Sequence, residues 1–291
     1  MDRKVLRDPA VAGYINDKFV PLRVEVTSAD ADLLRRYDLP RQAPMFLILG
    51  PDGEELDRQL GAMSVEEFLG FLKDAVGGNH FAALDRRARE GEGGCDFLLS
   101  YGRRLYGRGA PEAALVLRRV VDLDREEKRP GTVDAQYMLA RLAPGDESVA
   151  ALARFVGAHP GSVHAVEAHR TLAMTYAARG SVDEAIGSFE FLRSRGALEA
   201  PWQVHDYARL LAWNGRQVER ALALVDDALR AVPDEPRWLD TRAECLSRLG
   251  RYEDAIATES RAVEKAQRPE DRREFERALY EMKKRRAEAA R

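Results

Sequence analysis

Few side chains in this sequence have both the type and the spacing that chemistry requires. The chain has two cysteines, Cys95 and Cys245, which lie far apart and each inside a helical pattern. A disulfide framework needs more cysteines, and a metal site needs ligands at closer spacing. We therefore interpret both cysteines as small packing residues.

Three histidines, His159, His164 and His169, follow one another at intervals of five residues. That spacing does not place side chains on one face of a helix, and Pro160 directly follows the first of them. The sequence also contains no phosphate-binding loop, no dinucleotide-binding fingerprint and no His-Glu-x-x-His motif. We therefore expect no metal, no cofactor and no catalytic residue in this chain.

The composition narrows the class of partner. Charged residues make up 33% of the chain, but the net charge is only −3 and the isoelectric point is near 6.1, which gives no reason to expect nucleic acid or an anionic membrane. No apolar run approaches the ~20 residues that span a bilayer, and residues 1–4 lack the apolar core of a signal peptide. As written, the sequence indicates a cytoplasmic protein.

Small residues recur between residues 163 and 266 at a period typical of helical repeats. Ala185, Ala221 and Ala255 lie 36 and 34 residues apart, and each follows a glycine by five or six positions. Another alanine precedes each glycine by seven positions. Two antiparallel helices approach closely only where side chains are small, and glycine suits the turn between them, so the pattern predicts three helical hairpins. The glycines and the preceding alanines are Gly180, Gly215, Gly250, Ala173, Ala208 and Ala243.

The hairpin pattern resembles the tetratricopeptide repeat (TPR). The segment AECLSRLGRYEDAIATESRAV (243–263) is close to the family signature, and AMTYAARGSVDEAIGSFEFL (173–192) is nearly as close. Residues 204–233 fit with one extra residue. Weaker copies lie at 99–121, with Gly109 and Ala114, and at 132–160. The resemblance implies an all-α solenoid over residues 95–291.

The last helix of the predicted solenoid is charged except for one stripe. Phe275, Leu279 and Met282 follow an i, i+4, i+7 spacing, which is typical of a solubilising terminal cap.

TPR arrays usually bind a peptide or a partner helix on their concave face, which the first helix of each hairpin lines. The resemblance therefore implies a protein partner in this groove. Trp and Arg side chains often dominate the binding energy of protein interfaces, so those on this face are the main candidates for contact. The alternative is that Trp202 and Trp213 pack between repeats. Carried over from the family's register, the concave face presents Arg170, Met174, Trp202, His205, Arg209, Trp213, Asp240, Glu244 and Arg248.

Residues 1–78 follow a different pattern, which predicts a small mixed α/β module. Asp8-Pro9 opens a helix, 19–26 reads as a strand and 31–39 as a short helix. Residues 44–50 read as a buried strand that a Pro-Asp-Gly turn joins to a partner strand. The predicted linker, residues 79–94, follows Gly77-Gly78, contains a short helix from His80 to Arg89 and ends in Gly93-Gly94.

The module ends in a predicted amphipathic helix. Ser64 and Glu67 have the spacing of a capping box, and the apolar residues that follow are expected to point inward. These inward residues are Phe68, Leu69, Leu72 and Val76.

The order of these elements resembles thioredoxin with its first part removed. The segments DPAVAGYINDKFVPLRVEV, YDLPRQAPMFLILGPDGEEL and GAMSVEEFLGFL carry the resemblance, within residues 1–73. In that family the proline before the central buried strand is cis and helps to position bound substrate. The resemblance therefore implies that Pro44 is a substrate-positioning cis-proline.

This chain departs from the thioredoxin pattern at its chemistry. The Cys-x-x-Cys motif would lie just before Met1, together with a central strand, and neither is present. One hypothesis is a non-enzymatic scaffold in which a redox-inactive thioredoxin-like module serves as a second docking surface. The other is a thiol–disulfide oxidoreductase whose redox segment is encoded further upstream, in which case an exported location also becomes possible. Both hypotheses predict no thiol chemistry for the chain as written.

Overall fold

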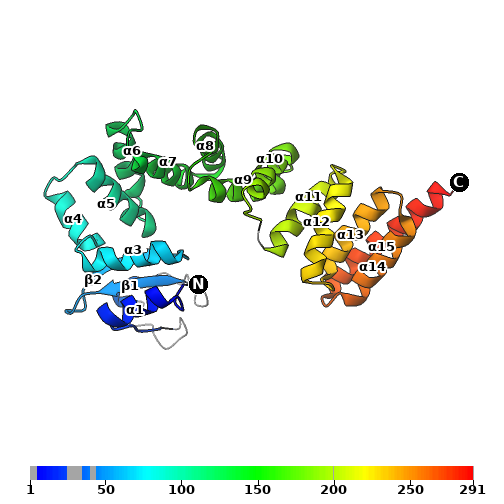
Figure 1. Ribbon diagram of the computed structural model, residues 1–291, viewed down its shortest axis with the longest axis horizontal. Coiled ribbons are helices and arrows are strands. Elements are labelled where there is room, and N and C mark those ends of the chain that lie inside the picture. The colour runs from blue at the N-terminus through cyan, green and yellow to red at the C-terminus, as the bar shows by residue number, and fades with distance from the viewer. Residues whose placement is uncertain (1–4, 25–34, 40–43, 199, 291) are drawn as a thin grey trace. The chain divides into compact units, whose positions relative to one another are not determined.

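The computed structural model describes residues 5–24, 35–39, 44–198 and 200–290. Within these residues the chain is mostly helical, with fourteen helices and two strands (Figure 1). Its contacts divide it into two compact units, Met1–Ala151 and Leu152–Arg291. No helix in the described ranges is both long and apolar enough to cross a membrane.

The first unit begins with the mixed module and continues into helices. Its elements are α1 (Pro9–Lys18), β1 (Met45–Leu49), β2 (Glu55–Leu60), α3 (Val65–Val76), α4 (Phe81–Arg89), α5 (Cys95–Gly107), α6 (Ala113–Leu123) and α7 (Pro130–Leu142). Helix α8 (Gly145–Ala158) spans the division between the units. The second unit continues with α9 (Ala165–Arg179), α10 (Val182–Ser194), α11 (Pro201–Trp213), α12 (Val218–Ala231), α13 (Pro236–Arg248), α14 (Tyr252–Lys265) and α15 (Pro269–Ala289).

The predicted β-hairpin is confirmed. Strands β1 and β2 pair antiparallel, with Met45 opposite Leu60 and a register irregularity between Ile48 and Leu49. The backbone N–H of Gly53 donates to the carbonyl oxygen of Gly50 at 3.0 Å, and Gly53 has φ +79°. Glycine occupies this left-handed conformation without steric cost, so the Pro-Asp-Gly turn fixes the hairpin.

The helix starts predicted in this module are also confirmed. The carboxylate of Asp8 accepts from two backbone N–H groups of α1, and Ser64 with Glu67 forms a complete capping box on α3. The prediction that Val76 points inward is wrong, because 51% of it is exposed. The buried face of α3 instead runs through Phe68, Phe71, Leu72 and Ala75, which follow i, i+3, i+4, i+7.

The predicted strand over 19–26 is not confirmed in its described part. Residues 19–24 form no strand, and Val20 and Leu22 are almost fully exposed, whereas residues 25 and 26 lie outside the described residues. Of the short helix predicted at 31–39, residues 35 and 36 are helical and 31–34 lie outside the described residues. The described residues contain one sheet, of two strands, so the thioredoxin-like fold stays a prediction.

Helix α4 packs on β2 and α5 rather than standing free. Its predicted range is nearly correct, with His80 as the N-cap residue. Asp57 of β2 is fully buried and accepts from the backbone N–H of Phe81 at 3.1 Å. The guanidinium of Arg104 on α5 lies 3.3 Å from the same carboxylate. Polar contacts therefore bind the hairpin to the helices that follow it. The domain limits at 78 and 94 stay predictions.

The three predicted helical hairpins of the second unit are confirmed as α9–α10, α11–α12 and α13–α14. The connecting glycines Gly180, Gly215 and Gly250 have φ of +74°, +61° and +75°. This left-handed conformation after a helix favours glycine, which explains their recurrence. All six predicted alanines at the helix crossings are fully buried, which permits the close approach of the paired helices.

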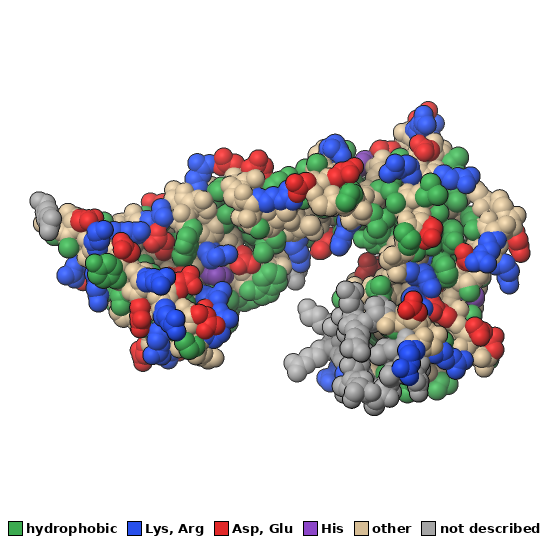
Figure 2. Space-filling model, turned by 180° about the vertical axis from the view of Figure 1, so that it is seen from behind, with side chains coloured by type: hydrophobic (Ala, Val, Ile, Leu, Met, Phe, Trp, Pro, Cys, Tyr) green, Lys and Arg blue, Asp and Glu red, His purple; other side chains and the backbone are tan. Residues whose placement is uncertain are grey.

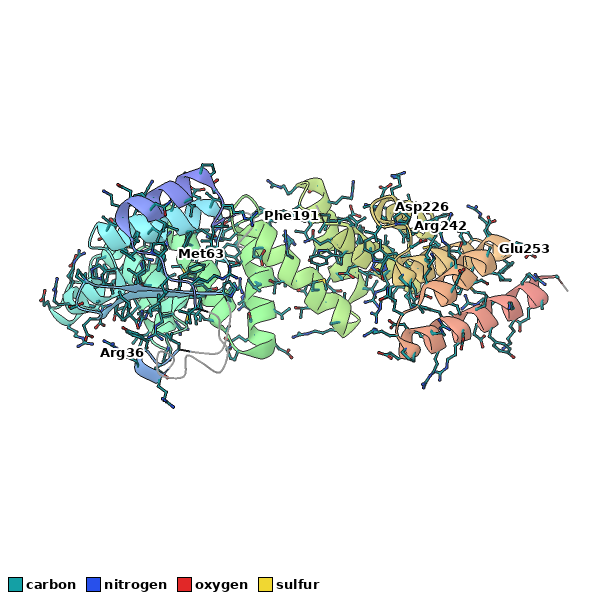
Figure 3. All side chains as sticks on the ribbon, turned by 90° about the horizontal axis from the view of Figure 1, so that it is seen from below. Arg36, Met63, Phe191, Asp226, Arg242 and Glu253 are labelled. Atoms are coloured by element: carbon teal, nitrogen blue, oxygen red, sulfur yellow. The ribbon has the colours of Figure 1, made fainter. Side chains whose placement is uncertain are left out.

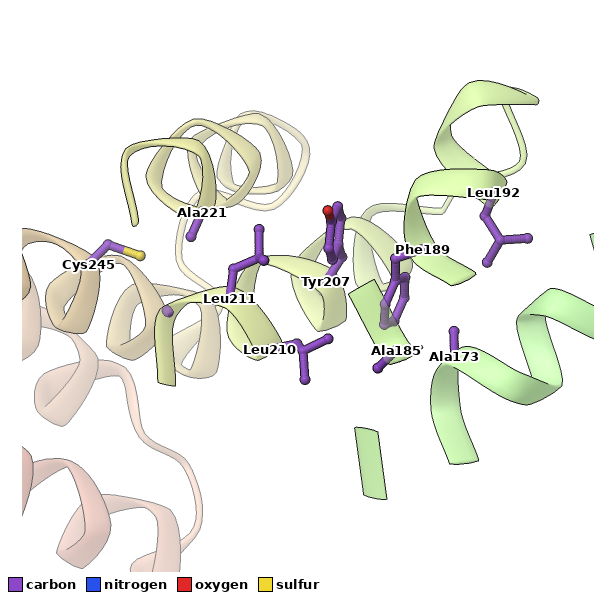
Figure 4. Close-up of a cluster of buried hydrophobic side chains, with 10 residues drawn as sticks. Ala173, Ala185, Phe189, Leu192, Tyr207, Leu210, Leu211, Ala221 and Cys245 are labelled. Carbon is purple, nitrogen blue, oxygen red and sulfur yellow. The ribbon is translucent and has the colours of Figure 1, made fainter. Parts of the chain in front are cut away.

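Bulkier side chains fill the space between neighbouring hairpins (Figure 4). The rings of Phe189 on α10 and Tyr207 on α11 stack with centroids 4.9 Å apart. Cys245 of α13 is buried in the same cluster, in agreement with its predicted packing role. The stripe on α15 is confirmed as well, because Phe275 and Met282 are buried and Leu279 is half-buried.

The weaker repeats also form helices, α5–α6 and α7–α8. The predicted alanine register in α6 is off by one position, because Ala113 is fully buried and Ala114 only half-buried. Leu117 of α6 is fully buried against Gly102 of α5, where a Cβ atom would lie 2.8 Å from the leucine side chain. Glycine therefore replaces alanine at this crossing, which weakens the sequence signal.

Candidate functional site

The predicted concave-face residues lie on α9, α11 and α13, the first helices of the three hairpins. Met174, Trp202 and Trp213 are 45%, 53% and 44% exposed. Arg209 is exposed, and Arg170 and Asp240 are partly exposed. Both tryptophans keep about half of their surface in contact with solvent and bury the rest, so each ring packs against the protein and still presents a surface to a partner.

A cleft of about 270 Å³ opens between α9 and α11. It brings together Met174, Arg209 and Trp213 of the predicted face, but not Trp202, Arg170 or Asp240. Near α11, three further lining residues were not predicted from the sequence, two on the helix and one at its C-cap. They follow the i, i+4, i+8 spacing of one helix face and could have been found from it. These residues are Asp206, Leu210 and Asn214.

Hydrogen bonds from side chains to backbone carbonyl groups hold the C-terminal end of α11. The side-chain amide of Asn214 donates to the carbonyl oxygen of Leu210 at 2.8 Å. Arg248 of α13 donates to the carbonyl oxygen of Trp213 at 3.2 Å. Helix ends leave carbonyl groups without helical partners, and these two bonds satisfy such groups. Trp213 is therefore held on a fixed backbone while its indole ring stays accessible.

Arg209 is a cation without a bonded counter-charge. Within the described residues its guanidinium makes no hydrogen bond or ion pair, although its charge lowers the pKa of His205 and favours the ionised forms of Asp206 and Asp240. Burial outweighs that effect on Asp206 and raises its pKa above the ordinary value. The five N–H donors of Arg209 are therefore available to acceptors on a bound molecule.

His205 supports the α11–α13 interface instead of lying on the surface. The side chain is buried, its Nε2 hydrogen-bonds with Thr241 Oγ1 at 2.9 Å, and its ring stacks on Trp238 with centroids 5.5 Å apart. Burial lowers its pKa to about 4, so the imidazole is neutral at physiological pH.

Glu244 is also buried, and two arginines bind it. Arg248 lies 2.5 Å and Arg285 3.1 Å from its carboxylate oxygens, so the latter ties α15 to α13. Arg242 pairs with Asp226 at 2.7 Å on the other side of α13, where both are labelled in Figure 3. Cations and anions are interspersed over the face shown in Figure 2.

The described residues of the N-terminal module include Pro44, the candidate for a substrate-positioning proline. Pro44 is half-buried directly before β1, and its carbonyl oxygen accepts from the backbone N–H of Gly61 at 2.9 Å. Both cysteines are free thiols outside this module; burial raises the pKa of Cys245 to about 12, which keeps it protonated and unreactive. In the ranges that the structure covers, no cluster of His, Cys, Asp or Glu could hold a metal ion.

The sequence profile of the tetratricopeptide repeat family matches residues 210–271, from the end of α11 into α15. A comparison with curated proteins gave no match.

Among solved structures, the chain is similar to MamA (AMB-1), at 18% identity and a TM-score of 0.45, over 58% of this chain and 90% of that one. It is also similar to a thermophilic TPR protein of Thermus thermophilus, at 22% identity and a TM-score of 0.36, over 64% of this chain and all of that one. The TPR domain of P58(IPK) matches at 14% identity and a TM-score of 0.36, over 76% of this chain and 67% of that one. The assignment of helical repeats rests on the family match and on the hairpins described above.

Proposed function

We propose that the second unit is a protein-interaction scaffold that binds a peptide segment of a partner in the cleft between α9 and α11. The observation that carries this proposal is the cleft itself, in which the exposed side chains of Met174 and Trp213 lie beside the unbonded cation Arg209. Large apolar side chains that gather in a concave site, with a few polar groups among them, are typical of binding surfaces.

The energetics of such a surface favour a peptide. A buried tryptophan removes on the order of 150–250 Å² from water, and each Å² contributes about 25 cal/mol. Part of this area is already covered in Trp213, so the gain on binding is smaller, but it remains comparable with that of an interface hot spot. Arg209 adds donors that suit the carbonyl groups of a peptide backbone.

The predicted binding residues divide into three groups in this proposal. Met174, Arg209 and Trp213 contact the partner directly, and Trp202, Arg170 and Asp240 extend the surface beyond the cleft. His205 and Glu244 are buried, so they act by holding α11, α13 and α15 in position.

For the N-terminal module we retain the thioredoxin-like interpretation, with the module as a second docking surface. The order of α1, the β1–β2 hairpin and α3, with Pro44 directly before β1, supports it. The alternative function is a thioredoxin-family disulfide oxidoreductase whose Cys-x-x-Cys segment is not in this chain. An insulin-reduction assay on this chain is expected to give no turnover, and measurable turnover would contradict the redox-inactive interpretation.

The peptide-binding proposal is tested by selecting from a random dodecapeptide library displayed on phage. A selected peptide is then titrated against the wild-type chain, Trp213→Ala and a control, Tyr280→Ala, which removes an exposed aromatic ring on α15. We expect Trp213→Ala to weaken binding by about 2 kcal/mol, roughly 30-fold, and the control to bind like the wild type. If no peptide is enriched, or if Trp213→Ala binds equally well, the proposal fails.

A further inference from the structure

The first helices of the three hairpins carry very different residues at one equivalent position, two residues before the turn glycine. The residues are Ala178 on α9, Trp213 on α11 and Arg248 on α13. Because successive hairpins repeat one supersecondary arrangement, a side chain at this position always stands near the C-terminal end of its helix. The three residues therefore decide how each helix end meets the next one.

The ends of α11 and α13 are bridged by the protein itself. The guanidinium of Arg248 donates to the carbonyl oxygen of Trp213 at 3.2 Å, and one of its nitrogens lies 3.0 Å from the position that a Cβ atom of Gly215 would take. Glu244, one turn earlier on α13, accepts from the same guanidinium at 2.5 Å and holds it in place. A long side chain therefore spans the gap between these two helix ends.

The ends of α9 and α11 lack such a bridge. The methyl side chain of Ala178 carries no hydrogen-bonding group, and none of the described residues donates to its carbonyl oxygen, the counterpart of the Trp213 carbonyl. On α11, Arg209 takes the place that Glu244 has on α13, so an arginine that bridged these ends would be repelled instead of held. The cleft is the space that remains, and Ala178 lines it.

The floor of the cleft is apolar. Phe189 and Leu210 line it although both are almost fully buried, so they form its bottom. Stacking on Tyr207 fixes the ring of Phe189. The volume of about 270 Å³ is below the ~300–1,000 Å³ of sites that enclose a drug-sized molecule, so the cleft suits one large side chain. An apolar side chain can reach this floor without leaving a polar group unpaired.

The charges that line the cleft are balanced. Of the lining residues, Asp206 and Arg209 are charged, and they lie three positions apart on α11, which places them on one side of the helix. A basic residue of a partner would suit Asp206 but would approach Arg209, and an acidic residue would do the reverse. An uncharged side chain therefore enters the cleft without a charge mismatch.

We propose that the partner segment is uncharged where it meets the cleft, and that it inserts one large apolar side chain between Ala178 and Trp213, down to Phe189. This inference rests on the proposed function and names the chemistry of the partner. Ala178 is then the residue that determines specificity, because its small side chain keeps the space open. The segment takes the bridging place that Arg248 has between α11 and α13, and its backbone N–H groups can donate to the carbonyl oxygen of Ala178.

The first test fills the cleft from within the protein. Ala178→Trp places on α9 the side chain that α11 carries at the equivalent position, and the control Ala223→Trp adds the same side chain at an exposed position of α12. A peptide selected on the wild type from the random dodecapeptide phage library is titrated against each form. We expect Ala178→Trp to weaken binding about 30-fold or more, and the control to bind like the wild type. Circular dichroism checks that the variants are folded.

The second test reads the chemistry of the selected peptides. One position should be enriched several-fold in Leu, Met, Phe, Trp or Tyr over the unselected library, without an excess of Lys, Arg, Asp or Glu beside it. In a synthetic peptide, replacement of that residue by alanine should weaken binding to the wild type about 30-fold. Because binding forms no ion pair, a rise in NaCl from about 50 to about 500 mM should change the Kd by less than about twofold.

The outcomes separate this inference from the function on which it rests. Peptides that depend on Trp213 but bind Ala178→Trp as tightly as the wild type do not enter the cleft, so they overturn the inference and leave peptide binding by α11 in place. Peptides enriched in either Lys and Arg or Asp and Glu, with binding that weakens more than about 10-fold over the same salt range, overturn it as well. If no peptide is enriched, both proposals fail.

Discussion

The substitution Glu259→Gln addresses the most unusual group in the second unit. Glu259 is fully buried on α14 and lies among three other carboxyl groups, of which that of Asp240 is close enough to share a proton with it. Glutamine has nearly the same shape and no ionisable proton. The variant therefore removes the titration while it preserves the packing of α14 against α13 and α15.

The sign of the effect follows from proton linkage. The pKa of Glu259 is raised from 4.5 in the unfolded chain to about 9 in the folded protein, so the folded protein holds the proton more tightly. Its contribution to stability is fully present below pH 4.5 and is lost as the pH rises towards 9. The loss is about 1.4 kcal/mol per pH unit for one group, or on the order of 4 kcal/mol between pH 5 and pH 8 as an upper limit. Glutamine does not incur this loss.

Tryptophan fluorescence is the appropriate assay, because all three tryptophans of the chain, Trp202, Trp213 and Trp238, lie in the second unit. Thermal unfolding is followed at several pH values between 5 and 8 for the wild type, Glu259→Gln and the control Glu264→Gln, which changes an exposed position of the same helix. We expect the stability advantage of Glu259→Gln to grow with pH, by about 2–4 °C in Tm per kcal/mol. Parallel pH profiles for the wild type and Glu259→Gln would refute the reasoning.

Two further predictions concern the scaffold. Gly250→Ala places a side chain at φ +75° and should lower the stability of the second unit by about 1 kcal/mol. Gly187→Ala, in the interior of α10 with open space around its Cβ position, should raise that stability by roughly 0.5–1 kcal/mol. The same fluorescence melts measure both variants, and a stabilised Gly250→Ala would contradict the turn assignment. Arg104→Ala leaves the buried carboxylate of Asp57 without its closest cation, so the free energy of unfolding of the first unit should fall by about 3–5 kcal/mol. Backbone amides of β2 and α5 should then exchange hydrogen faster than in an Arg103→Ala control. Equal exchange in both variants would show that the pair between Arg104 and Asp57 is dispensable.

Local signals made much of the fold predictable. Gly215, in the turn between α11 and α12, has φ +61°, a conformation that favours glycine. Ala221 is fully buried where the two helices cross, and the close approach of the helices requires a small side chain there. The same holds for the capping box at Ser64 and for the turn at Gly53, where one or two residues determine the structure. Elements of this kind depend on neighbours a few residues away, which a single sequence displays.

Positions that depend on distant neighbours were not predictable in the same way. The spacing of apolar residues in α3 is compatible with a Val76 side chain that points inward. The elements that pack against α3 bury Phe71 and Ala75 instead. His205 shares the spacing of the exposed face of α11, but Thr241 and Trp238 of the next hairpin bury it. Glu259 looks in sequence like one of many solvated helix residues. Its burial follows from where α13 and α15 lie against α14, which no local pattern shows.

Glu244 and Glu259 show two opposite effects of a buried carboxyl group on the stability of the second unit. Both carboxylates are buried, but Glu244 has two arginines, one of which fastens α15, whereas Glu259 has none among the described residues. At pH 8, replacement of Glu259 by an amide side chain should therefore not lower stability, because no arginine stabilises its ionised form. Glu259→Gln should therefore raise the stability of the second unit, and by more as the pH rises, whereas the arginines bound to Glu244 make that carboxylate part of the packing of α13 against α15.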